Sequence, residues 1–209
     1  MVDGYRAALD AALERAVTHG ERFVAGGVSL GAHVAATWAA QRRHDAGEHL
    51  AGLLLALPAW SGPAAGAPAA QAARATADLV RAGGVEAALA AARTGSPPWL
   101  AAELSRAWPG YGSGLAAALD AAAAEPGPRP AALASLAVPT GLAALVDDPV
   151  HPLAEARHWL SLLPRAVLHT ATLAAFGADP EVLGRATVLG WLQAGQLRDG
   201  PPPGRHSGR

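Results

Sequence analysis

The stretch that decides the fold is R-F-V-A-G-G-V-S-L-G-A-H-V-A-A-T-W-A-A, residues 22–40. Its first four residues contain the apolar run of Phe23 and Val24 and predict a short buried strand. Ser29 follows within the sequence G-V-S-L-G, which matches the pattern G-x-S-x-G. Residues 32–43 are then largely apolar and contain no helix breaker. The stretch therefore predicts a strand, a tight glycine turn and a helix, in that order.

The pattern G-x-S-x-G has a specific physical meaning when it lies between a strand and a helix. A serine on such a sharp turn has a strained backbone, and the residues two positions away must be small to avoid a collision across the turn. The turn presents the hydroxyl above the sheet, and the N–H of Leu30 at the helix N-terminus can stabilise an oxyanion. In a chain with 24 glycines the bare pattern is weak, and the alternative is a glycine-rich turn with an ordinary serine. The predicted strand and helix on either side favour the first interpretation.

Three further apolar runs predict strands, at residues 50–57, 138–146 and 165–170. Continuous apolar runs without a period of two are typical of strands that are buried on both faces of a parallel sheet. Helices are predicted at residues 5–19, 153–163 and 181–194. This alternation predicts an α/β protein with a parallel sheet of about four strands, flanked by helices on both faces.

A segment rich in Ala, Gly and Pro interrupts this alternation at about residues 61–130. It predicts three helical pieces, at residues 69–92, 99–108 and 114–124. We expect one domain over residues 1–198 with this insert inside it. Residues 199–209 contain three successive prolines and are expected to be a disordered tail.

This arrangement resembles a known family, the α/β-hydrolase fold of esterase-like serine hydrolases. Residues 22–40 are similar to the nucleophile strand, elbow and helix of that family, and residues 50–57 to the next strand, which leads into a lid-like insert. The sequence V-P-T-G-L-A-A-L-V-D-D-P-V-H-P at residues 138–152 resembles the strand that delivers the acid. The resemblance covers roughly residues 5–195. It implies that Ser29 attacks an ester or a related acyl bond and that Leu30 N–H holds the oxyanion.

The resemblance also implies an acid and a histidine, in the chain order Ser, Asp, His. Asp148 precedes a proline at the end of a predicted strand and is the expected acid, with Asp147 as the alternate. The family's histidine follows the last strand, and the best candidate there is His169. His151, three residues after Asp148, is a second candidate.

One departure from the family concerns the proton-transferring base. The aligned position of the histidine falls near Leu173, which cannot transfer a proton. We therefore predict an incomplete triad, with no imidazole nitrogen within about 3.2 Å of Ser29 Oγ. His33, four residues after Ser29, is expected to be a satisfied buried residue beneath the elbow.

A second departure concerns the start of the sheet. The family has about four strands before the nucleophile strand, whereas some twenty residues precede it here. The chain therefore resembles a partial α/β-hydrolase fold that lacks the N-terminal strands and the loop that supplies a second oxyanion N–H. The nucleophile strand becomes an edge strand, and we expect self-association through it. The alternative to an active hydrolase is a catalytically inactive or truncated relative that serves as a binding or interaction module.

Composition limits the partners and cofactors. Sixteen basic residues, all of them Arg, against 17 acidic ones give a net charge of −1, which argues against nucleic acid or an anionic membrane as the main partner. The absence of Cys excludes disulfides and thiolate chemistry. With no apolar stretch long enough to span a bilayer and no secretory pattern at residues 1–15, a cytoplasmic protein is expected. We expect a small-molecule ester or acyl substrate, no metal and no other cofactor.

Three tryptophans lie in or beside the insert, and these are Trp60, Trp99 and Trp108. One interpretation is that they line an apolar site for the substrate. The other is that they hold small Ala-rich helices together.

Overall fold

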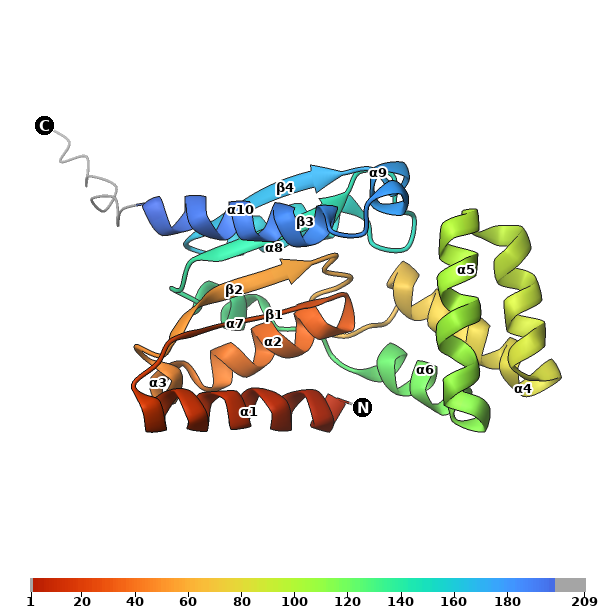
Figure 1. Cartoon of the computed structure of the whole chain (residues 1–209), viewed down its shortest axis with the longest axis horizontal. Coiled ribbons are helices and arrows are strands. Elements are labelled where there is room, and N and C mark those ends of the chain that lie inside the picture. The colour runs from red at the N-terminus through yellow and green to blue at the C-terminus, as the bar shows by residue number, and fades with distance from the viewer. Residues whose placement is uncertain (1, 198–209) are drawn as a thin grey trace, which may run out of the picture.

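The computed structural model describes residues 2–197, and its centre is one parallel sheet of four strands. The strands follow one another in chain order across the sheet and are β1 (Phe23–Val28), β2 (Leu50–Ala56), β3 (Thr140–Leu145) and β4 (Ala166–Ala171). All three strand pairs are parallel. The carboxyl ends of the strands therefore meet at one edge of the sheet, to the right in Figure 1.

Helices cover both faces of this sheet. On one face lie α1 (Val2–His19), α2 (Leu30–Gln41), α3 (Arg43–Ala46), α7 (Pro130–Ala134) and α8 (Leu153–Leu162). The other face is covered by α10 (Val182–Gln196), which crosses β2, β3 and β4. Gly141 permits this close approach, since a Cβ there would overlap the carbonyl oxygen of Thr187.

The main core lies between the sheet and α2, where the continuous apolar runs of the strands meet an apolar helix. Its largest fully buried side chain is Trp159 of α8, which packs in the same cluster as Leu53, Leu55 and Leu142. Burying a side chain of this size contributes about 1.5–3 kcal/mol. The strands thus read as unbroken apolar runs because helices cover them on both faces.

A helical insert lies between β2 and α7. It consists of α4 (Pro68–Gly95), α5 (Pro98–Ala107), the 3-10 segment η1 (Trp108–Gly114) and α6 (Leu115–Ala124). Figure 1 shows the insert beyond the carboxyl ends of the strands. The short helix α9 (Leu173–Ala178) follows β4 at the same edge. The insert therefore stands over the edge of a parallel sheet where ligands bind.

The predicted α/β class, four-stranded sheet and helical insert are confirmed. β1 is longer than predicted, because the strand continues through Gly26 and Gly27 up to the serine turn. β1 occupies the edge of the sheet, as predicted. The expected disordered tail at residues 199–209 lies outside the described residues.

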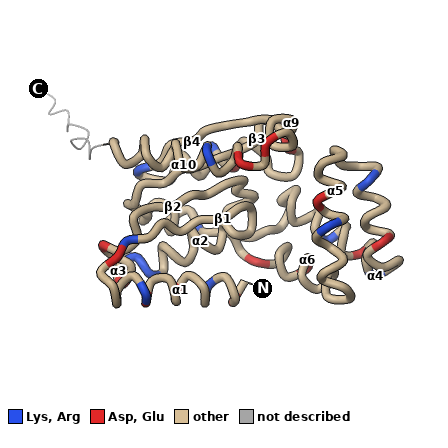
Figure 2. The backbone as a smooth tube through the Cα atoms, viewed as in Figure 1, with Lys and Arg blue, Asp and Glu red and all other residues tan. Residues whose placement is uncertain are grey.

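Charged side chains are distributed outside the sheet. None of the four strands contains Asp, Glu or Arg, and Figure 2 shows that charged residues gather on the helices and turns.

No helix within residues 2–197 combines the length and the apolar character that crossing a membrane requires.

Candidate active site

Ser29 lies at the junction between β1 and α2 and has a strained backbone. Its φ of 55° and ψ of −116° are rare for a residue with a side chain. The conformation is held from both sides: Ser29 N–H donates to the Ala56 carbonyl (2.9 Å), and the Ser29 carbonyl accepts from Ala32 N–H (3.0 Å). Such strain costs about 1–3 kcal/mol. The predicted strained serine at a strand-to-helix turn is confirmed.

Gly27 of the motif has a direct structural reason. A Cβ on Gly27 would lie 2.4 Å from the backbone carbon of Gly31. The turn at Ser29 brings these two backbones into contact, so a larger residue at position 27 would force them apart. Glycine at position 27 is therefore a packing requirement of this turn, whereas a Cβ on Gly31 would meet no atom within 4 Å.

His151 is the imidazole that reaches the serine hydroxyl. The distance between Ser29 Oγ and His151 Nε2 is 2.9 Å, and the other ring nitrogen, Nδ1, lies 2.9 Å from Asp148 Oδ2. The prediction that no imidazole nitrogen would come within hydrogen-bond distance of Ser29 is wrong. The three side chains form the chain of contacts that a Ser-His-Asp triad requires.

A tight turn after β3 explains how two residues only three apart can form this pair. Asp148 Oδ1 accepts the backbone N–H of Val150 (2.7 Å) and of His151 (3.2 Å). This local bonding folds the segment back, so the His151 ring returns over the Asp148 carboxylate. The signal in the sequence was the spacing D-P-V-H at residues 148–151.

His169 lies away from the serine hydroxyl. It is within β4, next to Ala143 of β3, and its Nε2 is 2.9 Å from Gln193 Oε1 of α10. His169 could serve as the base only if β4 ended before it, and the strand continues to Ala171. Asp147, the alternate acid, instead accepts the backbone N–H of Leu173 at 2.7 Å.

The surroundings of Asp148 favour its ionised form. Burial acts to raise the pKa of Asp148, but the hydrogen bond and charge of His151 and two backbone N–H groups outweigh it and lower the pKa. The side chain of Asp148 is 9% exposed and that of His151 16%. A largely buried carboxylate can thus orient the ring and stabilise the imidazolium that forms when His151 takes a proton.

His33 lies beneath the elbow and connects it to the start of the insert. Its Nε2 accepts the backbone N–H of Ala59 (3.0 Å) and, more weakly, of Trp60 (3.4 Å). Burial, with a smaller contribution from the charge of His151, lowers the pKa of His33 to about 4. His33 is therefore neutral at physiological pH, since an acceptor nitrogen must carry no proton.

A second set of contacts fixes residues 59–61 to α8, the helix that follows His151. Ser61 Oγ donates to Glu155 Oε1 at 2.6 Å, and Trp159 Nε1 donates to the same oxygen at 3.0 Å. Together with the bonds of His33, these contacts hold residues 59–61 against both helices that flank the site.

Leu30, the predicted oxyanion donor, is the first residue of α2. The first N–H groups of a helix have no acceptor within it, so Leu30 N–H is available next to the hydroxyl of Ser29. Within residues 2–197 no group of three or more His, Asp or Glu side chains is placed to hold a metal ion.

The three tryptophans differ in their surroundings. Trp60 is 7% exposed, and its Nε1 donates to the Glu125 carbonyl at 3.2 Å. Trp108 packs against the small core of the insert. Trp99 of α5 makes an edge-to-face contact with Phe176 of α9, with ring centroids 5.1 Å apart. Trp99 thus joins the insert to the segment after β4, and the predicted lining of a substrate site by these rings stays a prediction.

Comparison with solved structures identifies the fold. An α/β-hydrolase enzyme from a Medee basin deep-sea metagenome library superposes with a TM-score of 0.66 at 15% identity, covering 97% of this chain and 73% of that one. A thermophilic esterase from Thermogutta terrifontis gives a TM-score of 0.60 at 22% identity, covering 86% and 67%. A protein from Mycobacterium tuberculosis H37Rv, described as a non-heme bromoperoxidase, superposes with a TM-score of 0.62 at 20% sequence identity. The match covers 90% of this chain and 73% of that one.

The chain therefore has an α/β-hydrolase fold, and it spans 67–73% of the length of these three proteins. At identities of this size the likeness establishes the fold and leaves the reaction open. No protein family profile matches the sequence, and no curated protein matches it.

Proposed function

We propose that this protein is a serine hydrolase that cleaves an ester or a related acyl bond of a small molecule. The observation that carries the proposal is the continuous contact from Ser29 Oγ through His151 to Asp148, on a strained strand-to-helix turn. A serine hydroxyl is a poor nucleophile unless a neighbouring base removes its proton. His151 occupies the position of that base, and Asp148 fixes its Nδ1 as the protonated nitrogen.

In the proposed reaction, Ser29 Oγ attacks the carbonyl carbon of the substrate while its proton passes to His151 Nε2. The carbonyl oxygen becomes an oxyanion, which Leu30 N–H can stabilise at the N-terminus of α2. The protonated His151 then gives its proton to the leaving alcohol, and an acyl-serine remains. Water attacks this ester with His151 again as the base, which releases the acid and restores the hydroxyl. The insert is proposed to act as a lid over this edge of the sheet.

The second candidate function is ligand binding without turnover, and it depends on how many N–H groups stabilise the oxyanion. The elbow supplies the N–H of Leu30, and one such donor is worth about 10²–10³ in rate where others complete the hole. A relative with a single strong donor can keep the site as a binding module without appreciable turnover. In that case an acyl or ester ligand would bind beside Ser29 and leave unchanged.

A fluorophosphonate probe separates these two functions. The probe phosphonylates an activated serine, so we expect stoichiometric labelling of Ser29 in the native protein and none in Ser29→Ala. Mass spectrometry of the labelled peptide identifies the residue, and a panel of p-nitrophenyl esters with acyl chains of increasing length then measures turnover. Labelling with turnover supports the hydrolase. Absence of labelling in a folded protein would contradict it and favour the binding module.

A further inference from the structure

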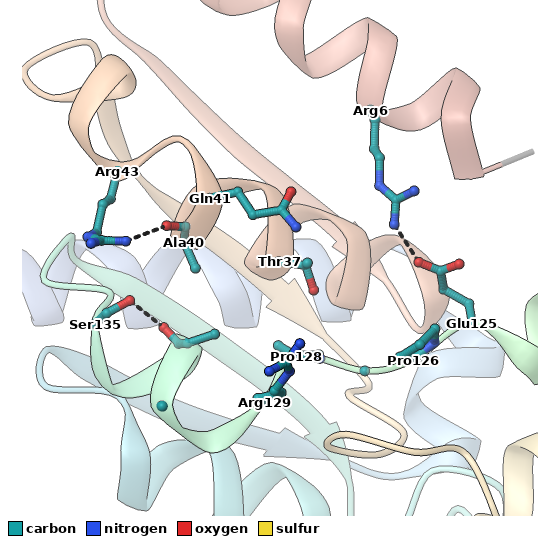
Figure 3. Close-up of a pocket in the computed structure, with 13 residues that line it drawn as sticks. Arg6, Thr37, Ala40, Gln41, Arg43, Glu125, Pro126, Pro128, Arg129 and Ser135 are labelled. Carbon is teal, nitrogen blue, oxygen red and sulfur yellow. Dashed lines mark hydrogen bonds and ion pairs between the residues drawn. The ribbon is translucent and has the colours of Figure 1, made fainter.

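A cavity of about 770 Å³ lies beside the C-terminal half of α2. Its walls come from α1, α2, the start of α3, the segment 125–129 and α7 with the residue after it, as Figure 3 shows. Thr37 lines it eight residues after Ser29, which corresponds to about 12 Å along the helix. Ser29, Asp148 and His151 are not among its lining residues. The cavity is therefore distinct from the candidate active site.

The charges around this cavity do not balance. Three arginines line it, Arg6, Arg43 and Arg129, against one carboxylate, Glu125. Arg6 is paired with Glu125 at 2.6 Å, a contact drawn in Figure 3. In the part of the chain that the structure describes, Arg43 and Arg129 have no carboxylate partner; Arg43 donates one hydrogen bond, to the Ala40 carbonyl at 3.3 Å. Two guanidinium groups thus remain with donors to offer a ligand.

A buried polar atom points to the same space. Thr37 Oγ1 is inaccessible to solvent and has no hydrogen-bond partner among the described residues. Its side chain lies between Gln41 and Pro128 in Figure 3, at the centre of the cavity wall. A buried hydroxyl without a partner costs about 1–3 kcal/mol, and rotation of the Thr37 side chain toward a ligand oxygen in the cavity would remove that cost.

Most of the remaining wall is apolar and comes from alanines and prolines, which are Ala40, Ala131, Ala132, Pro126 and Pro128, while Gln41 and Ser135 add polar groups. Ligand cavities typically measure about 300–1,000 Å³ and combine apolar walls with a few polar groups that fix orientation. The wall composition here fits a ligand with an apolar body and one anionic end. A guanidinium recognises a carboxylate or a phosphate through paired hydrogen bonds.

We propose that this cavity is a second binding site, for a small organic anion that carries a carboxylate or a phosphate on an apolar body. The guanidinium of Arg43 or of Arg129 binds the anionic group, the Thr37 hydroxyl rotates to donate a hydrogen bond, and the alanine and proline walls cover the apolar part. The proposal does not depend on the reaction at Ser29.

Calorimetric titration of the full chain with hexanoate, hexyl phosphate and hexanol at low ionic strength tests this site. We expect binding of at least one of the two anions at millimolar concentrations or below, and at least tenfold weaker binding of hexanol. The tighter of the two anions shows whether the ligand is a carboxylate or a phosphate. Equal binding of hexanol, or no binding of either anion, would overturn the proposal.

Variants then locate the binding. The double variant Arg43→Gln with Arg129→Gln should weaken anion binding at least tenfold, whereas Arg157→Gln, an exposed arginine of α8, should leave it unchanged. Glu125→Gln removes the carboxylate that pairs with Arg6 and should tighten binding about threefold or more, a gain that local damage does not produce. Protein labelled at Ser29, or Ser29→Ala, should bind as the native protein does. Loss of binding in Ser29→Ala, or native affinity in the double variant, would place the anion elsewhere and overturn the proposal.

Discussion

The imidazole Nε2 of His33 accepts the backbone N–H of Ala59 at 3.0 Å. His33 lies one helical turn after Ser29, and its backbone N–H donates to the Ser29 carbonyl at 3.2 Å. The ring packs edge-to-face on Trp60, with centroids 4.5 Å apart. One buried histidine therefore connects the strained serine turn with the first residues of the insert. This connection requires the neutral form, because a protonated Nε2 would face two N–H donors.

The first prediction is that His33 lowers the free energy of unfolding at acidic pH. Its pKa is about 4 when folded, against an ordinary value of 6.5. The unfolded chain therefore binds a proton as the pH falls through 6.5, whereas the folded chain does so only near 4. Stability falls across this window, by about 2–3 kcal/mol between pH 7 and pH 4.5. Urea unfolding at the two pH values measures this loss.

His33→Gln provides the comparison for this measurement, since the Gln carbonyl oxygen can also accept the Ala59 N–H but does not titrate. The acid-induced loss should shrink by about 2–3 kcal/mol in this variant. His158→Gln, at an exposed histidine of α8, should keep the full loss. An unchanged pH dependence in His33→Gln would show that other groups cause it.

The second prediction assigns the base by comparing two histidines. His151→Gln should slow fluorophosphonate labelling of Ser29 by about 10²-fold or more, because general-base assistance contributes about 10²–10⁴. His169→Gln should label at close to the native rate, since that ring contacts Gln193 instead of Ser29. The labelling rates of the variants are measured by gel fluorescence at successive times. A slow His169→Gln beside a fast His151→Gln would reverse the assignment.

The third prediction concerns the two adjacent carboxylates. Asp148→Asn removes the charge that orients His151 and should lower the labelling rate by about 10²–10⁴. Asp147→Asn keeps an oxygen that can accept the Leu173 N–H and should stay within about threefold of native. Because the two substitutions are isosteric and adjacent, a similar effect of both would contradict a specific role for Asp148.

The fourth prediction tests how the insert is held over the sheet edge. A Cβ at Gly177 would overlap the ring of Trp99, so Gly177→Ala should displace α5 from α9. We expect faster tryptic cleavage after Arg93 and Arg106, two arginines of the insert. Gly110→Ala, whose added methyl meets no atom within 4 Å, is the matched control. Equal cleavage of the two variants would mean that the Trp99 contact does not hold the insert.

The strands and most helices could be predicted from the sequence because each carries a local signal. Unbroken apolar runs mark β2 and β3, and the turn at Ser29 is marked by Gly27, which the contact with the Gly31 backbone requires. The short helices α3, α7 and α9 were not predicted, since four to six residues give no periodicity to detect.

The partner of Ser29 could not be chosen from the sequence, because a side chain's direction depends on the exact end of a strand and the shape of the following turn. Two further residue pairs between β3 and β4 keep His169 within the sheet, and two hydrogen bonds to Asp148 bring His151 back to the serine. The cavity beside Thr37 was also not foreseen, since its walls come from three regions that are far apart in the chain, around Arg6, residues 37–43 and residues 125–135.

The open edge of β1 leads to the last prediction. The N–H groups of Phe23 and Ser29 bond toward β2, so by alternation those of Val24, Gly26 and Val28 point away from the sheet. No charged residue lies in β1, and Val28 is 53% exposed. Such an edge can pair with another chain.

We therefore expect the 209-residue chain to self-associate through β1 as its concentration rises. Val28→Lys places a charge in this edge strand and should shift the protein toward the monomer, because pairing with another chain would partly desolvate the ammonium. Leu79→Lys, which changes a similarly exposed apolar residue of the insert, should not. Size-exclusion chromatography with light scattering at several concentrations measures the effect. A native monomer at every concentration, with a sharp thermal transition, would mean that the edge of β1 is protected without a partner strand.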